Sequence, residues 1–132
     1  MNVQIVFIDN DEVNNKIVQI LMEKAGIGDG KFFQDPNEGL QYLAGDLSPI
    51  YRLLLFIDLN MPGMTGWNVL EKLPESILER IRKSTCLVYV LHNQVDKDQL
   101  ARAKADKRVT HYLVKPLSRE TIRLILFSAK NK

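Results

Sequence analysis

Three charged residues, Asp9, Asp58 and Lys115, each come directly after a short apolar run of the sequence. Two carboxylates brought close together repel each other unless a cation lies between them, and Mg²⁺ prefers such oxygen ligands. A lysine ammonium is a point charge suited to a phosphoryl oxygen. A metal ion, a carboxylate nucleophile and a lysine together make a phosphoryl-transfer site with an acyl-phosphate intermediate. This chemistry requires a fold that brings the three residues together.

The apolar runs have the length and composition of buried strands. Runs without polar alternation, bounded by turn residues, are typical of strands buried on both faces of a parallel sheet. We predict five strands, at Val3–Ile8, Lys31–Gln34, Leu53–Ile57, Cys86–Leu91 and Thr110–Val114.

Helical patterns follow each strand, and several carry start signals. Asp35-Pro36-Asn37-Glu38 combines a cap, an early proline and a glutamate, and Thr65, Asp96 and Ser118 are further predicted caps. Pro74 is expected to interrupt or restart the third helix.

The first helix is predicted to begin at Val13. Gly26 and Gly28 are expected to end it. Its core-facing residues are predicted from their spacing to be Val13, Ile17, Ile20, Leu21 and Ala25.

Strand and helix thus alternate five times, which favours an α/β fold with a five-stranded parallel sheet and helices on both faces. Right-handed crossovers make a doubly wound order, 2-1-3-4-5, the simplest arrangement. Residues 1–132 show no linker or repeat and are expected to form a single domain. The carboxyl ends of parallel strands share one edge, so Asp9, Asp58 and Lys115 should converge there.

Composition and charge narrow the functional classes. The 132 residues, 45% hydrophobic and 26% charged, are typical of one globular domain. The single cysteine, Cys86, fits a reducing compartment, and no apolar run or basic leader suggests a membrane, so a cytoplasmic location is expected. Residues 67–132 carry 14 basic and seven acidic residues. Aromatic residues do not alternate with these basic residues, so nucleic-acid binding is not expected.

Three segments resemble the receiver (response-regulator) domain of two-component signalling: FIDND at residues 7–11, FIDLNMPGMTGW at 56–67 and YLVKPL at 112–117. The resemblance covers essentially the whole chain and implies a flavodoxin-like fold. It also implies that Asp58 accepts a phosphoryl group from a sensor histidine kinase or a histidine phosphotransfer protein. The chain would then be a phosphoacceptor rather than an enzyme, at most catalysing its own phosphotransfer and dephosphorylation.

The resemblance also assigns the residues around Asp58. Asp9 belongs to the acidic metal pocket, the backbone carbonyl of Asn60 is a Mg²⁺ ligand, and Lys115 contacts the phosphate. The Lys115-Pro116 bond is expected to be cis, and Tyr112 matches an aromatic switch position.

Two positions depart from the family pattern. Asn10 stands where a second acid is usual; its carboxamide oxygen can touch Mg²⁺ but lacks the charge, so Mg²⁺ binding is expected to be weakened. The Thr or Ser expected at the end of strand four is replaced by His92 or Asn93, depending on how the loop is aligned. Either side chain can still donate to a phosphate oxygen.

The leading hypothesis is a stand-alone receiver that signals by phosphorylation-dependent docking to a downstream protein. The strand-four loop and the last two helices would form the responsive surface. The chain ends with Lys130-Asn131-Lys132, so output is expected to pass through another protein, and a homodimer is compatible with this reading.

Two other functions compete with this hypothesis. One is a pseudo-receiver, an interaction module without regulated phosphorylation, suggested by Asn10 and the missing hydroxyl. The other is a haloacid-dehalogenase-type phosphatase in which Asp9 is the nucleophile and Asp11 the general acid/base.

Overall fold

The computed structural model describes residues 2–27, 30–45, 47–49 and 51–130 of the chain. Gly28, predicted to help end the first helix, lies outside the described residues. In the part of the chain that is described, no helix is long and apolar enough to cross a bilayer.

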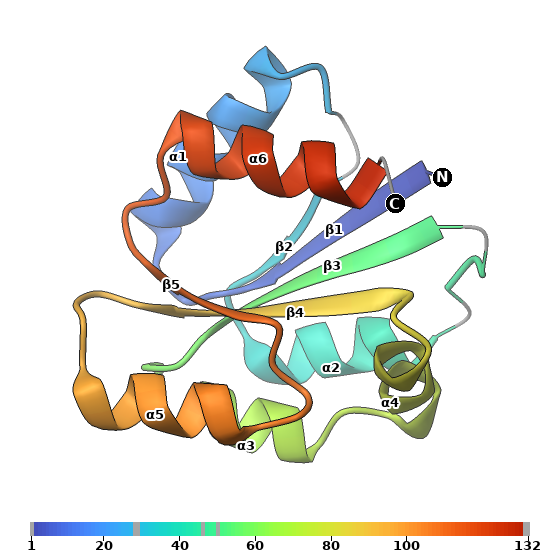
Figure 1. Ribbon diagram of the computed structural model, residues 1–132, viewed down its shortest axis with the longest axis vertical. Helices are drawn as coiled ribbons and strands as arrows, with labels where there is room; N and C mark the ends of the chain where they lie inside the picture. Colours follow the sequence, from blue (N-terminus) through green and yellow to red (C-terminus); the bar gives the residue numbers. More distant parts are fainter. Residues whose placement is uncertain (1, 28–29, 46, 50, 131–132) are drawn as a thin grey trace.

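Five parallel strands form one sheet in the order β2-β1-β3-β4-β5 (Figure 1). This confirms the predicted α/β class and strand order. The strands are β1 (Asn2–Ile8), β2 (Gly30–Phe33), β3 (Tyr51–Asp58), β4 (Cys86–His92) and β5 (His111–Val114). Among the described residues the helices are α1 (Glu12–Lys24), α2 (Pro36–Ala44), α3 (Gly66–Glu71), α4 (Glu75–Arg82), α5 (Lys97–Ala105) and α6 (Arg119–Lys130).

The helices cover both faces of the sheet, as a doubly wound fold requires. Figure 1 shows α1 and α6 together on one face, and α2, α3, α4 and α5 on the other. Each face has its own apolar cluster. The α1/α6 side packs around Phe7, Phe56 and Leu91, whereas the opposite side packs around Leu55, Ile57 and Val90.

The predicted helix starts form as expected from their capping chemistry. The Asp35 and Asp96 side chains accept backbone N–H groups of α2 and α5. Thr65 and Asn68 form a reciprocal capping box at α3. Pro74 separates α3 from α4, because proline has no backbone N–H with which to continue α3.

The predicted core face of α1 is wrong except at Leu21, which is partly buried against the core; Ala25 is exposed. Val13, Ile17 and Ile20 are 69%, 40% and 46% exposed. The residues of α1 that are buried are Asn14, Asn15, Val18 and Met22. Apolar residues occur on two faces of this helix, so periodicity alone could not tell which one packs on the sheet. An exposed apolar stripe consisting of Val13, Ile17 and Ile20 results.

A ladder of stacked rings crosses all five strands on the α1/α6 face of the sheet. In sheet order its members are Phe32, Phe7, Phe56, Tyr89 and His111, each paired in register with the next. The centroid separations are 4.9, 4.3, 4.7 and 5.8 Å, with interplanar angles of 26° or less. In-register stacking of this kind contributes to sheet stability beyond the area it buries.

Candidate functional site

The fold brings Asp9, Asp58 and Lys115 together at the carboxyl edge of the sheet. Asp9 follows β1, Asp58 ends β3, and Lys115 follows β5. Lys115 Nζ lies 3.0 Å from Asp9 Oδ2 and 3.3 Å from Asp58 Oδ2. All three side chains are almost fully buried, with 6% or less of each exposed. The Lys115-Pro116 peptide bond is cis, as expected.

Asp9 is held by donors that the sequence did not reveal. Its carboxylate accepts the Asp11 backbone N–H at 2.9 Å and Asn14 Nδ2 at 3.1 Å. Asn15 Nδ2 donates to the Asp9 carbonyl at 2.8 Å. Asn14 and Asn15 lie on the buried face of α1. In the sequence, the one indication of this role was a pair of adjacent amides at the start of the helix. They fix the position of Asp9 before any ligand binds.

Asp11 also belongs to the surroundings of the site. Its Oδ1 caps α1 by accepting the Asn14 backbone N–H, while its Oδ2 lies 3.8 Å from Lys115 Nζ. The carboxylate is half-exposed. Asp11 therefore adds negative charge at the mouth of the site, although its capping bond restrains it.

The protonation states follow from burial and from the charges nearby. Burial raises the pKa of Asp58 to about 6, and the negative charge of Asp9 acts in the same direction. The hydrogen bond from the Asn60 N–H and the charge of Lys115 oppose this rise. Burial alone would lower the pKa of Lys115, but attraction to Asp9 and Asp58 overcomes it and the pKa is raised. Lys115 therefore stays an ammonium.

The oxygen donors around Asp58 suit a hard divalent cation, but their charge is low. Asp9 and Asp58 supply two carboxylates, and the Asn60 N–H donates to Asp58 Oδ1 at 3.1 Å, which holds the loop that carries the Asn60 carbonyl nearby. Asn10 and Asn60 are exposed residues beside the site. Among the described residues no three His, Cys, Asp or Glu side chains cluster in a way that could hold a metal. The two carboxylates are oxygen donors of the kind that Mg²⁺ prefers, and the residue that follows Asp9 is the neutral Asn10 rather than a third acid.

The end of β4 is built around His92 rather than Asn93. His92 pairs with Val114, and its carbonyl accepts the Lys115 backbone N–H at 2.8 Å. Asn93 lies beyond the strand and is exposed. His92 Nδ1 accepts the Gln94 backbone N–H at 3.2 Å, so the imidazole is engaged with its own loop.

Tyr112 holds the same loop from β5. Its hydroxyl donates to the Gln94 carbonyl at 2.9 Å, and its ring stacks on His92 with centroids 6.3 Å apart. Both backbone polar groups of Gln94 are therefore bound by these two rings. We call this arrangement the Gln94 clamp.

The start of α3 approaches the Asp58 backbone closely. A Cβ added at Gly66 would lie 2.6 Å from the Asp58 carbonyl oxygen, so only glycine fits there. The next residue, Trp67, is buried; its Nε1 donates to Gln99 Oε1 at 2.6 Å, and the Arg102 guanidinium lies 4.2 Å from its ring. Trp67 thus connects the segment after Asp58 to α5.

Together these residues give a buried carboxylate that faces an ammonium and is flanked by a second acid. A carboxylate in this position can act as a nucleophile toward an electrophile that carries negative charge, because Lys115 offsets the repulsion.

Solved structures with the same fold cover almost the entire chain. A two-component response regulator from Cytophaga hutchinsonii is 21% identical, with a TM-score of 0.82 and full coverage of both chains. A response regulator receiver protein from Dyadobacter fermentans DSM 18053 is 19% identical, with a TM-score of 0.81 and 98% and 99% coverage of this chain and that chain. The chemotaxis protein CheY4 from Vibrio cholerae is 20% identical over the same shares, with a TM-score of 0.73.

The assignment to a family rests on a match of the sequence to a family model. No curated protein matches this chain. Residues 5–127 match the family described as the response regulator receiver domain, a span that includes Asp9, Asp58 and Lys115. The chain therefore belongs to the response regulator receiver domain family of two-component signalling.

Proposed function

We propose that this receiver domain accepts a phosphoryl group on Asp58 from a phosphohistidine of a sensor histidine kinase or histidine phosphotransfer protein. The observation that carries the proposal is the contact between Asp58 Oδ2 and Lys115 Nζ, 3.3 Å apart in a buried site. An ammonium at that distance can remain paired with the acceptor while a phosphoryl oxygen arrives beside it.

The transfer is a simple displacement. One Asp58 carboxylate oxygen attacks phosphorus, the phosphorus–nitrogen bond breaks, and the imidazole leaves with the electron pair. The product is an acyl phosphate on Asp58 whose new oxygens need positive partners. Lys115 is one such partner. Its ammonium already contacts Asp58, so it needs little movement to reach the new oxygens.

Mg²⁺ is the proposed cofactor, and it would neutralise phosphoryl oxygens when bound. The residues that would hold it are Asp9, Asp58, the amide oxygen of Asn10 and the backbone carbonyl of Asn60. The neutral Asn10 supports the proposal that this binding is weak.

The proposed output is phosphorylation-dependent docking to a downstream protein. His92 takes the place of the usual hydroxyl, and Tyr112 the place of the aromatic switch. Both bind Gln94, so a change at His92 can reach the surface through the Gln94 clamp. The exposed stripe of α1 begins at Val13, four residues after Asp9, and offers an apolar surface to a partner beside the site.

Treatment with acetyl phosphate and Mg²⁺, followed by intact-protein mass spectrometry, tests the proposal. We expect wild type and the control Asp98→Ala, which alters an exposed acid, to gain the mass of one phosphoryl group. Asp58→Ala should gain none. No gain in the wild type, or an equal gain in Asp58→Ala, would rule the proposal out.

A pseudo-receiver is the second candidate, and the neutral Asn10 favours it, because an amide attracts a hard cation less than a second acid would. The Lys115 ammonium also contacts both carboxylates, so a metal would have to compete with it for them. A titration with Mg²⁺ followed by Trp67 fluorescence separates the two functions. A fluorescence response together with phosphorylation supports the phosphoacceptor, whereas neither signal at millimolar Mg²⁺ supports the pseudo-receiver.

The phosphatase hypothesis gains nothing from the geometry. Asp9, its nucleophile, has no exposed surface, and both of its carboxylate oxygens are engaged by Lys115. Asp11, its general acid/base, is used as the cap of α1.

A further inference from the structure

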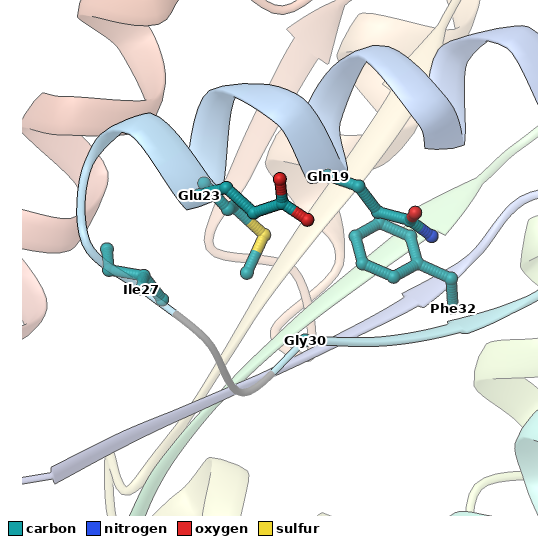
Figure 2. Close-up of a pocket in the computed structure, with 6 residues that line it drawn as sticks. Gln19, Glu23, Ile27, Gly30 and Phe32 are labelled. Atoms are coloured by element: carbon teal, nitrogen blue, oxygen red, sulfur yellow. The ribbon is translucent and has the colours of Figure 1, made fainter.

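Two cavities of different character flank α1 near its carboxyl end, far along the helix from Asp9. The first, of about 280 Å³, lies between α1 and β2. Figure 2 shows Glu23 and Gln19 of α1 on the same side of this cavity as the ring of Phe32, and Glu23 is the one charged residue among its described lining residues. The second cavity, of about 360 Å³, lies between α1 and α6.

The α1–α6 cavity is lined by three cations. They are Lys24 in the last turn of α1, and Arg119 and Arg123 in the first half of α6. Among the residues that the structure describes, no carboxylate lines this cavity. Within the described ranges, none of the three cations takes part in a salt bridge. Their positive charge is therefore not held in an ion pair with a described residue and is available to a ligand.

The floor of the cavity is apolar. Ala25, Ile27 and Leu126 contribute to it, together with Phe127. Phe127 and Leu124 are 68% and 67% exposed, and with Arg123 and the acidic Glu120 they also line a neighbouring cavity of about 450 Å³. The two cavities share Arg123 and Phe127, so they form one groove along α6, which we call the α6 groove.

We propose that the α6 groove binds an acidic segment of a partner protein that carries a bulky apolar side chain. The apolar side chain would enter the cavity between α1 and α6, and flanking carboxylates would pair with Lys24, Arg119 and Arg123. Among the described residues, the α6 groove is lined by the three cations and by one carboxylate, Glu120, so its charge is positive on balance and favours an acidic partner.

The shape of the site favours a peptide over a membrane surface. A cavity of this volume accepts one or two inserted side chains, which a flat lipid headgroup layer does not supply. Membrane recognition by charge also generally uses larger clusters, of about four to eight basic residues. The groove is separate from the Asp58 site, so this inference does not depend on phosphorylation.

The test uses a fluorescein-labelled peptide of about 12 residues, composed of Glu, Asp and Ser with two central Leu. Fluorescence anisotropy with the full chain should show binding that weakens with added salt. Arg119→Glu/Arg123→Glu should weaken binding by about tenfold or more, whereas Lys104→Glu/Lys107→Glu, with the same charge change on exposed residues near α5, should not. Arg119→Gln/Arg123→Gln gives a milder change if the double reversal does not fold.

The ¹⁵N-labelled protein should show peptide-induced shifts concentrated in the carboxyl end of α1 and in α6. A peptide with Ser in place of Leu should bind more weakly, and Asp58→Ala should bind as the wild type does. Equal binding by the two charge-reversal variants, or a Kd weaker than about 1 mM for the wild type, overturns the inference. Binding to phosphatidylglycerol-containing vesicles without binding to the peptide also overturns it, in favour of a membrane surface.

Discussion

Lys115 Nζ contacts Oδ2 of Asp58 at 3.3 Å while remaining 3.0 Å from Oδ2 of Asp9. One ammonium thus holds together two carboxylates that the register of β1 and β3 forces to be neighbours. The energetic consequence is visible at Asp58, whose pKa is raised to about 6 because burial and Asp9 outweigh Lys115. The site is therefore strained electrostatically before any phosphoryl group arrives.

Asp58→Asn should stabilise the metal-free protein at neutral pH. The pKa of Asp58 is higher in the folded state than its ordinary 3.8, so folding favours the protonated form, and stability is lost as the pH rises toward about 6. Removing the charge should raise the free energy of unfolding by about 1–3 kcal/mol near pH 7.5, and much less near pH 4. Urea unfolding in the presence of a chelator measures this difference. Asp98→Asn, at an exposed position, is the control and should show no such gain.

Asn10→Asp should strengthen Mg²⁺ binding. It restores a third carboxylate to a donor set that now has two, and hard cations respond strongly to ligand charge. We expect an increase in affinity of about tenfold or more, measured by isothermal titration calorimetry. Asn37→Asp adds the same charge at an exposed position of α2 and should leave the affinity nearly unchanged. Equal affinities of Asn10→Asp and the wild type would remove Asn10 from the metal site.

His92→Thr should loosen the Gln94 clamp. Threonine has no ring to stack on Tyr112, and its hydroxyl accepts a backbone N–H two residues on only more weakly than the Nδ1 of His92 does. Loss of one such hydrogen bond costs about 0.5–1.5 kcal/mol, so the Gln94 amide should exchange with solvent several-fold faster. Asn93→Thr, one residue further along, is the matched control. Similar exchange rates in both variants would mean that His92 does not hold the loop.

Asn14→Ala should destabilise the protein far more than Val13→Ala. Asn14 is buried and donates to Asp9, whereas its neighbour Val13 is 69% exposed. We expect a loss of about 1–3 kcal/mol for Asn14→Ala, because a hydrogen bond to a charged group is lost. Val13→Ala should change stability by less than about 0.5 kcal/mol. Thermal and urea unfolding can rank the two; the opposite order would restore the face of α1 predicted from the sequence.

Most of the fold followed from local chemistry. Uninterrupted apolar runs such as Leu53–Ile57 have few alternatives to a doubly buried strand, and caps such as Thr65 mark helix starts without tertiary information. The meeting of Asp9, Asp58 and Lys115 followed because parallel strands end at one edge. Those predictions depend only on strand direction and order.

The details that sequence alone did not give depend on contacts between elements. Periodicity assumes that apolar residues face the core, and α1 breaks this assumption by burying Asn14 and Asn15 beside Asp9. That β4 ends at His92, which pairs with Val114, required the register of β4 against β5, because neither strand alone fixes where the loop begins. Both cases lie at or beside the site, where polar function overrides hydrophobic pattern.

The aromatic ladder fixes the register of the two strands that lead to Asp9 and Asp58. Phe7 and Phe56 stack at 4.3 Å with an interplanar angle of 1°, and Asp9 and Asp58 each lie two residues further along the same two strands. A slip of one residue between β1 and β3 would turn one ring to the opposite face and destroy the stack. The spacing of the two acids is therefore set by an apolar alignment that needs no attraction between them. We therefore expect any movement at the site to occur in the loops beyond the aromatic ladder, while the strands keep their register.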